Sequence, residues 1–432
     1  MIAVLPFIAL IIFFSACTKE GPMGPAGKDG TNGTNGTAGC VTCHNSQKVE
    51  ARVTQFELSK HSYGVVAEEE AGNTGCSPCH ESEGFKYMCA NNVPATFSLV
   101  AGKYVNNYAC SPSSAYGEIN CFTCHVKLHT NYDTTDLPGL TNTAAVSMTM
   151  WAGAKTIDLT QDGGISNLCV KCHQPRPFTA SNQDGRILNY DSLKSFPAVV
   201  FFDSAIGKGK ANQLIPSYRT HTHYGVVGAF FAGKGAIEFA GTIPYLPNSA
   251  HTTVATCQDC HMADMTGKAG GHTFFSKGNF NGCNATGCHN ITGPVSATNA
   301  KYWINPRKTI KDLLESLAAK LSENGTEIMN KNPDATSNLW YGLTTNNYDG
   351  YLNVYDPVNN PTNVSGCFQN ASPSSSWTTA QKNLNKTFPK FNLTNAQMGA
   401  IINFQFCLRE YSMGIHNYNY SFALLTNTLA VL

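Results

Sequence analysis

Cysteine and histidine recur together at a fixed spacing along this chain of 432 residues. Five segments carry two cysteines separated by two residues and followed directly by histidine, and a sixth has four intervening residues. The cysteines are Cys40 and Cys43, Cys76 and Cys79, Cys121 and Cys124, Cys169 and Cys172, Cys257 and Cys260, and Cys283 and Cys288, and the histidines are His44, His80, His125, His173, His261 and His289. From the frequencies of the two residue types, chance would supply only about 0.02 five-residue copies, so the pattern serves a chemical purpose.

The spacing suits covalent attachment of a porphyrin. Cysteines three positions apart lie on one side of a helical turn, from which both sulfurs can reach the vinyl groups of one porphyrin. The histidine that follows can place its imidazole on the iron as the proximal ligand. Zinc sites also use cysteine pairs, but they need no histidine directly after each second cysteine. The motifs therefore predict six covalently bound c-type haems, and the sixth motif requires the loop between Cys283 and Cys288 to bulge.

The remaining histidines are candidates for the second axial position of each iron. Of 13 histidines in the chain, seven lie outside the motifs, which is close to one for each haem. These seven are His61, His129, His221, His223, His251, His272 and His416. His221 and His223 are two residues apart and compete for one position. The count predicts histidine on both sides of every iron.

On these motifs the chain resembles multihaem c-type cytochromes. Short segments are similar to the superfamily of pentahaem nitrite reductases, octahaem hydroxylamine oxidoreductases and their electron-transfer relatives. These segments are residues 256–262, Gly271-His272, and Gly414-Ile415-His416-Asn417 with Tyr420, Leu424 and Leu425. The segment His223-Tyr224-Gly225 matches a ligand position of that superfamily, so the resemblance favours His223 over His221. The expected distal ligands are thus His61, His129, His223, His251, His272 and His416.

Two functions are compatible with such a set of haems. Iron with two histidine ligands has no open site for a substrate, which favours one-electron transfer to redox partner proteins or an extracellular acceptor. The alternative is an oxidoreductase that acts on nitrogen or sulfur oxyanions at one open haem. Pentahaem nitrite reductases usually mark that haem with Cys-x-x-Cys-Lys, which this chain lacks, and none of its 18 tyrosines is identified as the cross-linked residue of hydroxylamine oxidoreductases. We assign no catalytic residue from the sequence.

The N-terminus predicts export. Ala3 to Phe14 is an apolar run of twelve residues, shorter than the ~20 that span a bilayer but suited to a signal peptide. It leads into Phe14-Ser15-Ala16-Cys17, which resembles a lipobox, although cleavage of an ordinary signal peptide nearby is the alternative. We expect residues 1–16 to be the signal peptide of an outer-membrane lipoprotein anchored through Cys17. Whether the protein faces the periplasm or the cell surface stays open.

The rest of the chain divides into three parts by glycine spacing and hydrophobic periodicity. Residues 17–39 carry glycine at every third position from Gly21 to Gly39, which predicts a collagen-like, flexible tether. Residues 40–300 show little periodicity, so haems are expected to supply their core. Residues 301–432 are expected to form a helical subdomain that contributes a distal haem ligand, with one helix behind Asn305-Pro306, one capped by Thr394 and a last one containing Phe422. The predicted fold class is mainly α, with extensive irregular loops and little β.

Charge and the remaining cysteines complete the prediction. The formal net charge is +1, which excludes nucleic-acid binding through a basic face. Four of the 17 cysteines lie outside the motifs and the lipobox. Disulfides between Cys89 and Cys110 and between Cys367 and Cys407 are the simplest assignment, with other pairings and free thiols as alternatives. Whether subunits form oligomers or filaments is not determined by the sequence.

Overall fold

Helices, most of them short, dominate the part of the chain that the computed structural model describes. This part comprises residues 44, 47–63, 76–91, 97–100, 103–106, 117–125, 139–151, 153–176, 190–195, 222–246, 249–289, 295–322, 328–331, 348–352, 379 and 393–432. The helices before residue 300 are α3 (Val49–Glu57), α4 (Lys60–Tyr63), α6 (Ser77–His80), α7 (Ser82–Asn91), α8 (Cys121–Cys124), α9 (Ile165–Cys172), α10 (Tyr190–Ser195), α11 (Val227–Phe231), α12 (Ala250–Val254), α13 (Cys257–His261) and the 3-10 helix η2 (Gly271–Thr273). The longer helices are α14 (Lys301–Lys320), α16 (Asn395–Arg409) and α17 (Tyr418–Val431).

Strands occur in the described residues as three small antiparallel pairs. They are β1 (Phe97–Val100) with β2 (Lys103–Asn106), β3 (Val146–Ser147) with β4 (Thr156–Ile157), and β5 (Met329–Lys331) with β6 (Tyr348–Leu352). Much of the described chain between residues 117 and 300 is turn or irregular. The predicted fold class, mainly α with irregular loops and little β, is confirmed.

Helix α14 forms where apolar residues recur at helical spacing. Ile310, Leu314 and Leu317 are fully buried along one face, as the periodicity predicts. The expected start at Asn305-Pro306 is wrong, because the helix begins at Lys301 and includes the proline. The first turn is fixed by the carbonyl of Ala300, which accepts hydrogen bonds from the backbone of Trp303 and Ile304 at 2.9 Å each.

Helix α16 is apolar on nearly every side and packs against α10, α14 and α17. The hydroxyl of Thr394 accepts a hydrogen bond from the Gln397 amide, and the Gln397 side chain accepts one from the Thr394 amide. This capping box confirms the predicted helix start. Near the middle of α16, the buried Asn403 side chain bonds to the backbone of Ile237 and to the hydroxyl of Thr428, which ties the helix to α17 and to an upstream segment.

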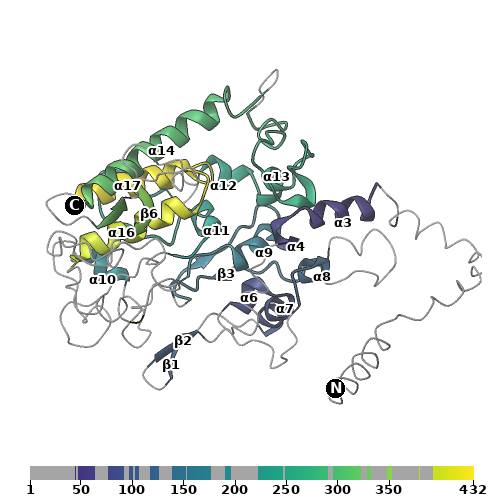
Figure 1. Cartoon of the computed structure of the whole chain (residues 1–432), viewed down its shortest axis with the longest axis horizontal. Helices are drawn as coiled ribbons and strands as arrows, with labels where there is room; N and C mark the ends of the chain where they lie inside the picture. The colour runs from purple at the N-terminus through teal and green to yellow at the C-terminus, as the bar shows by residue number, and fades with distance from the viewer. Residues whose placement is uncertain are drawn as a thin grey trace, which may run out of the picture.

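One large core joins the C-terminal helices to residues 146–239. Phe230 packs against Phe406 and Tyr420, with ring centres 5.6 and 5.5 Å apart. A second, small cluster consists of Phe85, Cys89 and Leu168, with a few partly buried neighbours. In Figure 1, α14, α16 and α17 gather on the left, whereas α3, α4, α6 to α8 and α13 lie to their right. The large core therefore lies on one side of the molecule.

The expected disulfides do not form at the two cysteines that the structure describes. Cys89 and Cys407 are free and buried, whereas Cys110 and Cys367 lie outside the described residues. Burial raises the pKa of Cys89 to about 11 and that of Cys407 well above its ordinary value. Both thiols pack within apolar clusters, where cysteine serves as a small apolar side chain.

The N-terminal predictions, the signal peptide, the lipidated Cys17 and the tether, also lie outside the described residues. No helix among the residues described above has the length and apolar character needed to cross a membrane.

Candidate functional site

Four of the Cys-x-x-Cys-His motifs lie on or directly at short helices. The motif cysteines lie within α8, α9 and α13 and, at α6, at the N-cap and inside the helix, so each pair shares one turn. In three of these motifs the amide of the histidine donates to the carbonyl of the first cysteine, at 3.1 Å for His80, 2.9 Å for His125 and 3.0 Å for His173. The turn therefore fixes the backbone of the histidine relative to both sulfurs.

The sixth motif makes the same hydrogen bond, from the histidine amide to the carbonyl of the first cysteine, across a longer loop. The amide of His289 donates to the carbonyl of Cys283 at 3.0 Å, even though six positions separate them. The bulge includes Gly287, whose φ of 87° is a left-handed conformation that glycine adopts without strain. The extra residues are thus accommodated without loss of the bond that closes the other motifs.

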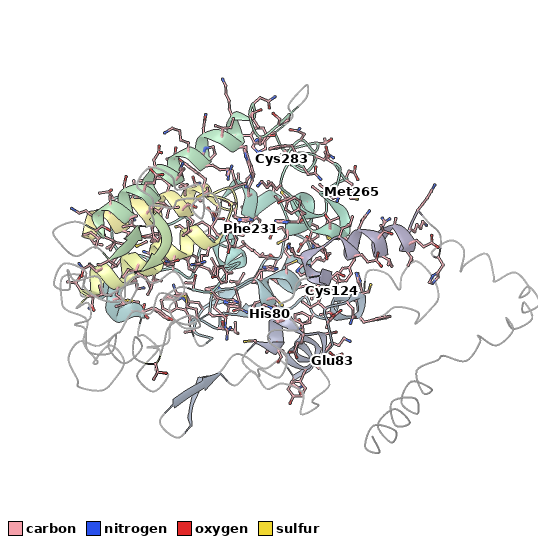
Figure 2. All side chains as sticks on the ribbon, in the orientation of Figure 1. His80, Glu83, Cys124, Phe231, Met265 and Cys283 are labelled. Carbon is pink, nitrogen blue, oxygen red and sulfur yellow. The ribbon has the colours of Figure 1, made fainter. Side chains whose placement is uncertain are left out.

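Five motif histidines each face one of the expected distal histidines. The ring centres are separated by 6.1 Å in His80–His223, 6.5 Å in His125–His272, 6.1 Å in His173–His61, 6.3 Å in His261–His416 and 6.2 Å in His289–His251. The members of each pair come from distant parts of the sequence. Figure 2 labels three motif residues, His80, Cys124 and Cys283, to the right of the C-terminal helices.

The separation of these rings matches two ligands on opposite sides of one metal. A ring nitrogen lies about 1.15 Å from the imidazole centre and binds a first-row metal at about 2.0 Å, so opposed imidazoles have centres roughly 6.3 Å apart. At the tetrahedral angle of zinc the same bonds would give roughly 5.1 Å. The observed range of 6.1 to 6.5 Å therefore fits the axial positions of a haem iron and not a tetrahedral zinc site.

Hydrogen bonds orient several of these rings. Nδ1 of His251 lies 2.8 Å from the carbonyl of Ile415, and Nδ1 of His261 lies 2.9 Å from the carbonyl of Phe274. Nδ1 of His416 instead lies 2.7 Å from a carboxylate oxygen of Glu410. Since an acceptor fixes the proton on Nδ1, the other nitrogen, Nε2, carries the lone pair that a metal requires.

Burial favours the neutral, metal-binding form of five of these rings. Burial, followed by the neighbouring His61, His261 and His80, lowers the pKa of His173 to about 4. Burial, together with His125 and Arg52, lowers the pKa of His272 to about 4. Burial likewise lowers the pKa of His61, His261 and His289.

The distal histidines are positioned by short helices and by strained loops. His61 lies in α4, His251 in α12 and His272 in η2. The amide of His272 donates to the side chain of Gln55 in α3, at 3.0 Å. His223 has a left-handed φ of 77°, a conformation that costs energy for a residue with a Cβ and is typical of functional sites.

Four of the motifs lie next to one another. The thiol of Cys79 contacts that of Cys172, and the thiol of Cys169 contacts that of Cys257. Helix α9 accordingly packs against both α6 and α13. The carbonyl of Asp259 and the Cα of Cys260 lie so close to Gly282 that a side chain there would collide with them. The second, fourth, fifth and sixth motifs therefore form one continuous series.

Part of the predicted set lies beyond the described residues, namely Cys40, Cys43, His129 and His221. His44 itself lies in the described part of the chain, but its contacts with these four residues do not. Glu410 belongs to no motif of the sequence, yet it is fully buried and accepts hydrogen bonds from His416, Ser412 and Gly414. An acidic residue at the end of an apolar helix, six positions before a candidate ligand, was the available signal.

The surroundings of Glu410 favour an ionised carboxylate. Burial by itself raises the pKa of Glu410, but the hydrogen bonds from His416, Ser412 and Gly414 favour the charged form, and the pKa lies below its ordinary value. Three donors around one buried carboxyl group favour the charged form in this way.

Comparison with known proteins gives a distant structural likeness. No protein-family model and no curated protein sequence matches the chain. Among solved structures, the crystal structure of outer cell wall cytochrome OcwA aligns with 88% of this chain at 13% sequence identity and a TM-score of 0.38. The alignment spans 50% of that cytochrome, so this chain matches about half of its length.

Proposed function

We propose that the chain is an exported hexahaem c-type cytochrome that transfers electrons. The observation that carries this proposal is the set of five histidine pairs, each of which joins a Cys-x-x-Cys-His motif to a distant histidine across 6.1 to 6.5 Å. Iron held between two histidines exchanges one electron at a time and has no coordination site left for a substrate.

The proposed axial ligands follow from the ring pairs. They are His80 with His223, His125 with His272, His173 with His61, His261 with His416, and His289 with His251. For the first motif, His44 would be paired with His129, which leaves His221 as the spare histidine. The twelve motif cysteines would each form one thioether bond.

The residues around the pairs support transfer along a series of centres. The turn that carries Cys169, Cys172 and His173 contacts the turns of the second and fifth motifs, and the fifth contacts the sixth. His173 itself interacts electrostatically with His61, His261 and His80. This placement puts the fourth motif between the second and the fifth.

Export and lipid anchoring through Cys17 at the outer membrane are part of the same proposal, supported by the N-terminal sequence. The protein would deliver electrons to a redox partner protein or an extracellular acceptor. A reductase of nitrogen or sulfur oxyanions is the second candidate. It would need an open iron, and the first motif is where one could occur, since each of the other motif histidines faces a second imidazole.

Intact-mass measurement and a coulometric titration of the purified mature protein test the proposal. We expect a mass increment of six haems, uptake of six electrons per chain, and a mass at the N-terminus that reflects lipidated Cys17. A chain without covalent haem would overturn the assignment. Turnover of nitrite, hydroxylamine or sulfite, together with one high-spin haem, would favour the enzyme instead.

A further inference from the structure

Three of the paired rings, those of His251, His261 and His416, differ in the group that accepts the proton on Nδ1. Main-chain carbonyls accept from His251 and His261. The distal ring of the fifth motif, His416, faces the carboxylate of Glu410 at 2.7 Å. Among the hydrogen bonds described for the paired rings, this is the one made to a charged acceptor.

The carboxylate is built into the loop between α16 and α17. Glu410 is fully buried. One of its oxygens accepts from the Gly414 amide at 2.8 Å, and the other accepts from both Ser412 and His416. The backbone of the loop is bent by left-handed conformations at Tyr411, Met413 and Gly414, which bring the acid and the imidazole together although six positions separate them.

A carboxylate on Nδ1 changes the ligand strength of the opposite nitrogen. By accepting the N–H hydrogen bond it increases the electron density of the imidazole, so Nε2 becomes a stronger donor. A stronger donor stabilises ferric iron more than ferrous iron, and the reduction potential falls. A neutral carbonyl acceptor produces the same effect to a smaller degree, because hydrogen bonds to charged groups are about twice as strong.

We propose that Glu410 is a positioning residue that lowers the reduction potential of the centre between His261 and His416. This inference rests on the proposed function, since it assumes that both histidines ligate haem iron. The fifth motif lies between the fourth and the sixth in the series. The centre with the lowered potential would therefore lie inside the series and not at its end.

The near-parallel rings of His261 and His416 predict an EPR signal that can be distinguished from those of most other pairs. Their planes differ by 8°, whereas those of His125 and His272 differ by 29° and those of the other three pairs by 66° to 87°. Parallel axial imidazoles give low-spin ferric haem a rhombic EPR spectrum, and perpendicular ones give a highly anisotropic signal. The rhombic signals can therefore be titrated separately.

The test is an EPR-monitored redox titration of the holoprotein with Glu410→Gln. An amide in place of the carboxylate keeps the shape and removes the charge. We expect one rhombic component to become easier to reduce, with the ferric-to-ferrous ratio at a fixed potential changing about tenfold, or ~59 mV for one electron. Glu238→Gln is the matched control, because Glu238 contacts Lys155 and Tyr420 and touches no paired histidine. It should leave both rhombic components in place.

A second variant keeps the proposal testable if the Glu410→Gln protein does not fold. Ser412→Ala removes a donor that competes with His416 for the same oxygen. It should therefore shift the same component in the opposite direction. A Glu410→Gln holoprotein with unchanged rhombic components, or a Ser412→Ala holoprotein with an unchanged or raised potential, would overturn the role of Glu410. Absence of low-spin haem from the unmodified protein would instead overturn the proposed function and, with it, this inference.

Discussion

Helices α16 and α13 differ in how they are stabilised and in how far their side chains are buried. In α16, 14 of 15 residues are buried, and its phenylalanines lie in the core shared with α11 and α17. In α13, which carries Cys257, Cys260 and His261, none of the five residues is buried. The first helix is stabilised by packing of its own side chains. The second is held by its cap and presents two thiols and an imidazole.

The same contrast extends to the two regions around them. The large core contains side chains of the C-terminal helices and of described segments between residues 146 and 239, whereas the cluster near α6 to α9 contains three buried apolar residues. In the motif region, caps and backbone hydrogen bonds fix imidazoles at separations that leave room for a metal between them. In the proposed holoprotein, the haems would supply the interior that the local sequence lacks.

Production of the chain without covalent haem attachment should separate the two regions most strongly. Amide exchange in residues 76–91, 117–125 and 257–289 should lose most of its protection, because these segments bury few apolar side chains. Amides of residues 396–408 should stay protected. Hydrogen-exchange mass spectrometry measures both. Equal protection of the motif segments with and without haem would contradict the contrast.

Truncation within the large core should destabilise the protein without touching the haems. Phe404 is fully buried in α16, so Phe404→Ala should lower the free energy of unfolding by about 3–5 kcal/mol. Denaturant unfolding followed by circular dichroism gives the value, and the visible spectrum should stay unchanged. Leu246→Ala, at an exposed position, is the control with a change within about 0.5 kcal/mol. A changed haem spectrum in Phe404→Ala would show that the regions are not separable.

Replacement of one distal ligand should have an effect confined to one centre. His223→Gly should convert one low-spin haem per chain to high-spin, and added imidazole should restore it. His221→Gly should leave the spectrum unchanged, because His223 is the histidine that faces His80. Magnetic circular dichroism distinguishes the two spin states. The opposite result, with His221→Gly giving the high-spin haem, would exchange the two assignments.

The smallest expected effect concerns the cap of α16. Thr394→Ala removes the hydroxyl that accepts from the Gln397 amide and should cost about 1 kcal/mol. Thr394→Ser, which keeps the hydroxyl, is the control. Chemical denaturation is the measurement, and a cost near zero would mean that the cap adds nothing to packing of the helix.

The sequence predicted the periodic helices and the motif residues better than the loops. Thr394 and Gln397 signal the start of α16 locally, and Ile310, Leu314 and Leu317 signal the buried face of α14. The start of α14 at Lys301 was missed because it depends on the carbonyl of Ala300 rather than on proline. The sequence left disulfides and free thiols open for Cys89 and Cys407, because burial of a thiol in an apolar cluster depends on tertiary contacts.

For the site, the motif spacing, the histidine count and the family resemblance predicted both sets of histidines but could not pair them. His173 and His61, or His261 and His416, come together only through the packing of α4, η2 and the loop after α16. Glu410 was missed for the same reason, since its contact with His416 depends on left-handed residues in that loop. Pairing and tuning of ligands are properties of the tertiary fold.

The EPR spectrum of the fully oxidised holoprotein tests the central claim, that five histidine pairs enclose iron, most directly. The ring planes predict two rhombic low-spin components, from His261–His416 at 8° and His125–His272 at 29°, and three highly anisotropic ones from the pairs at 66°, 87° and 87°. The first motif adds one further haem. High-spin signals from more than one haem per chain, or low-spin signals of a single class, would contradict the account.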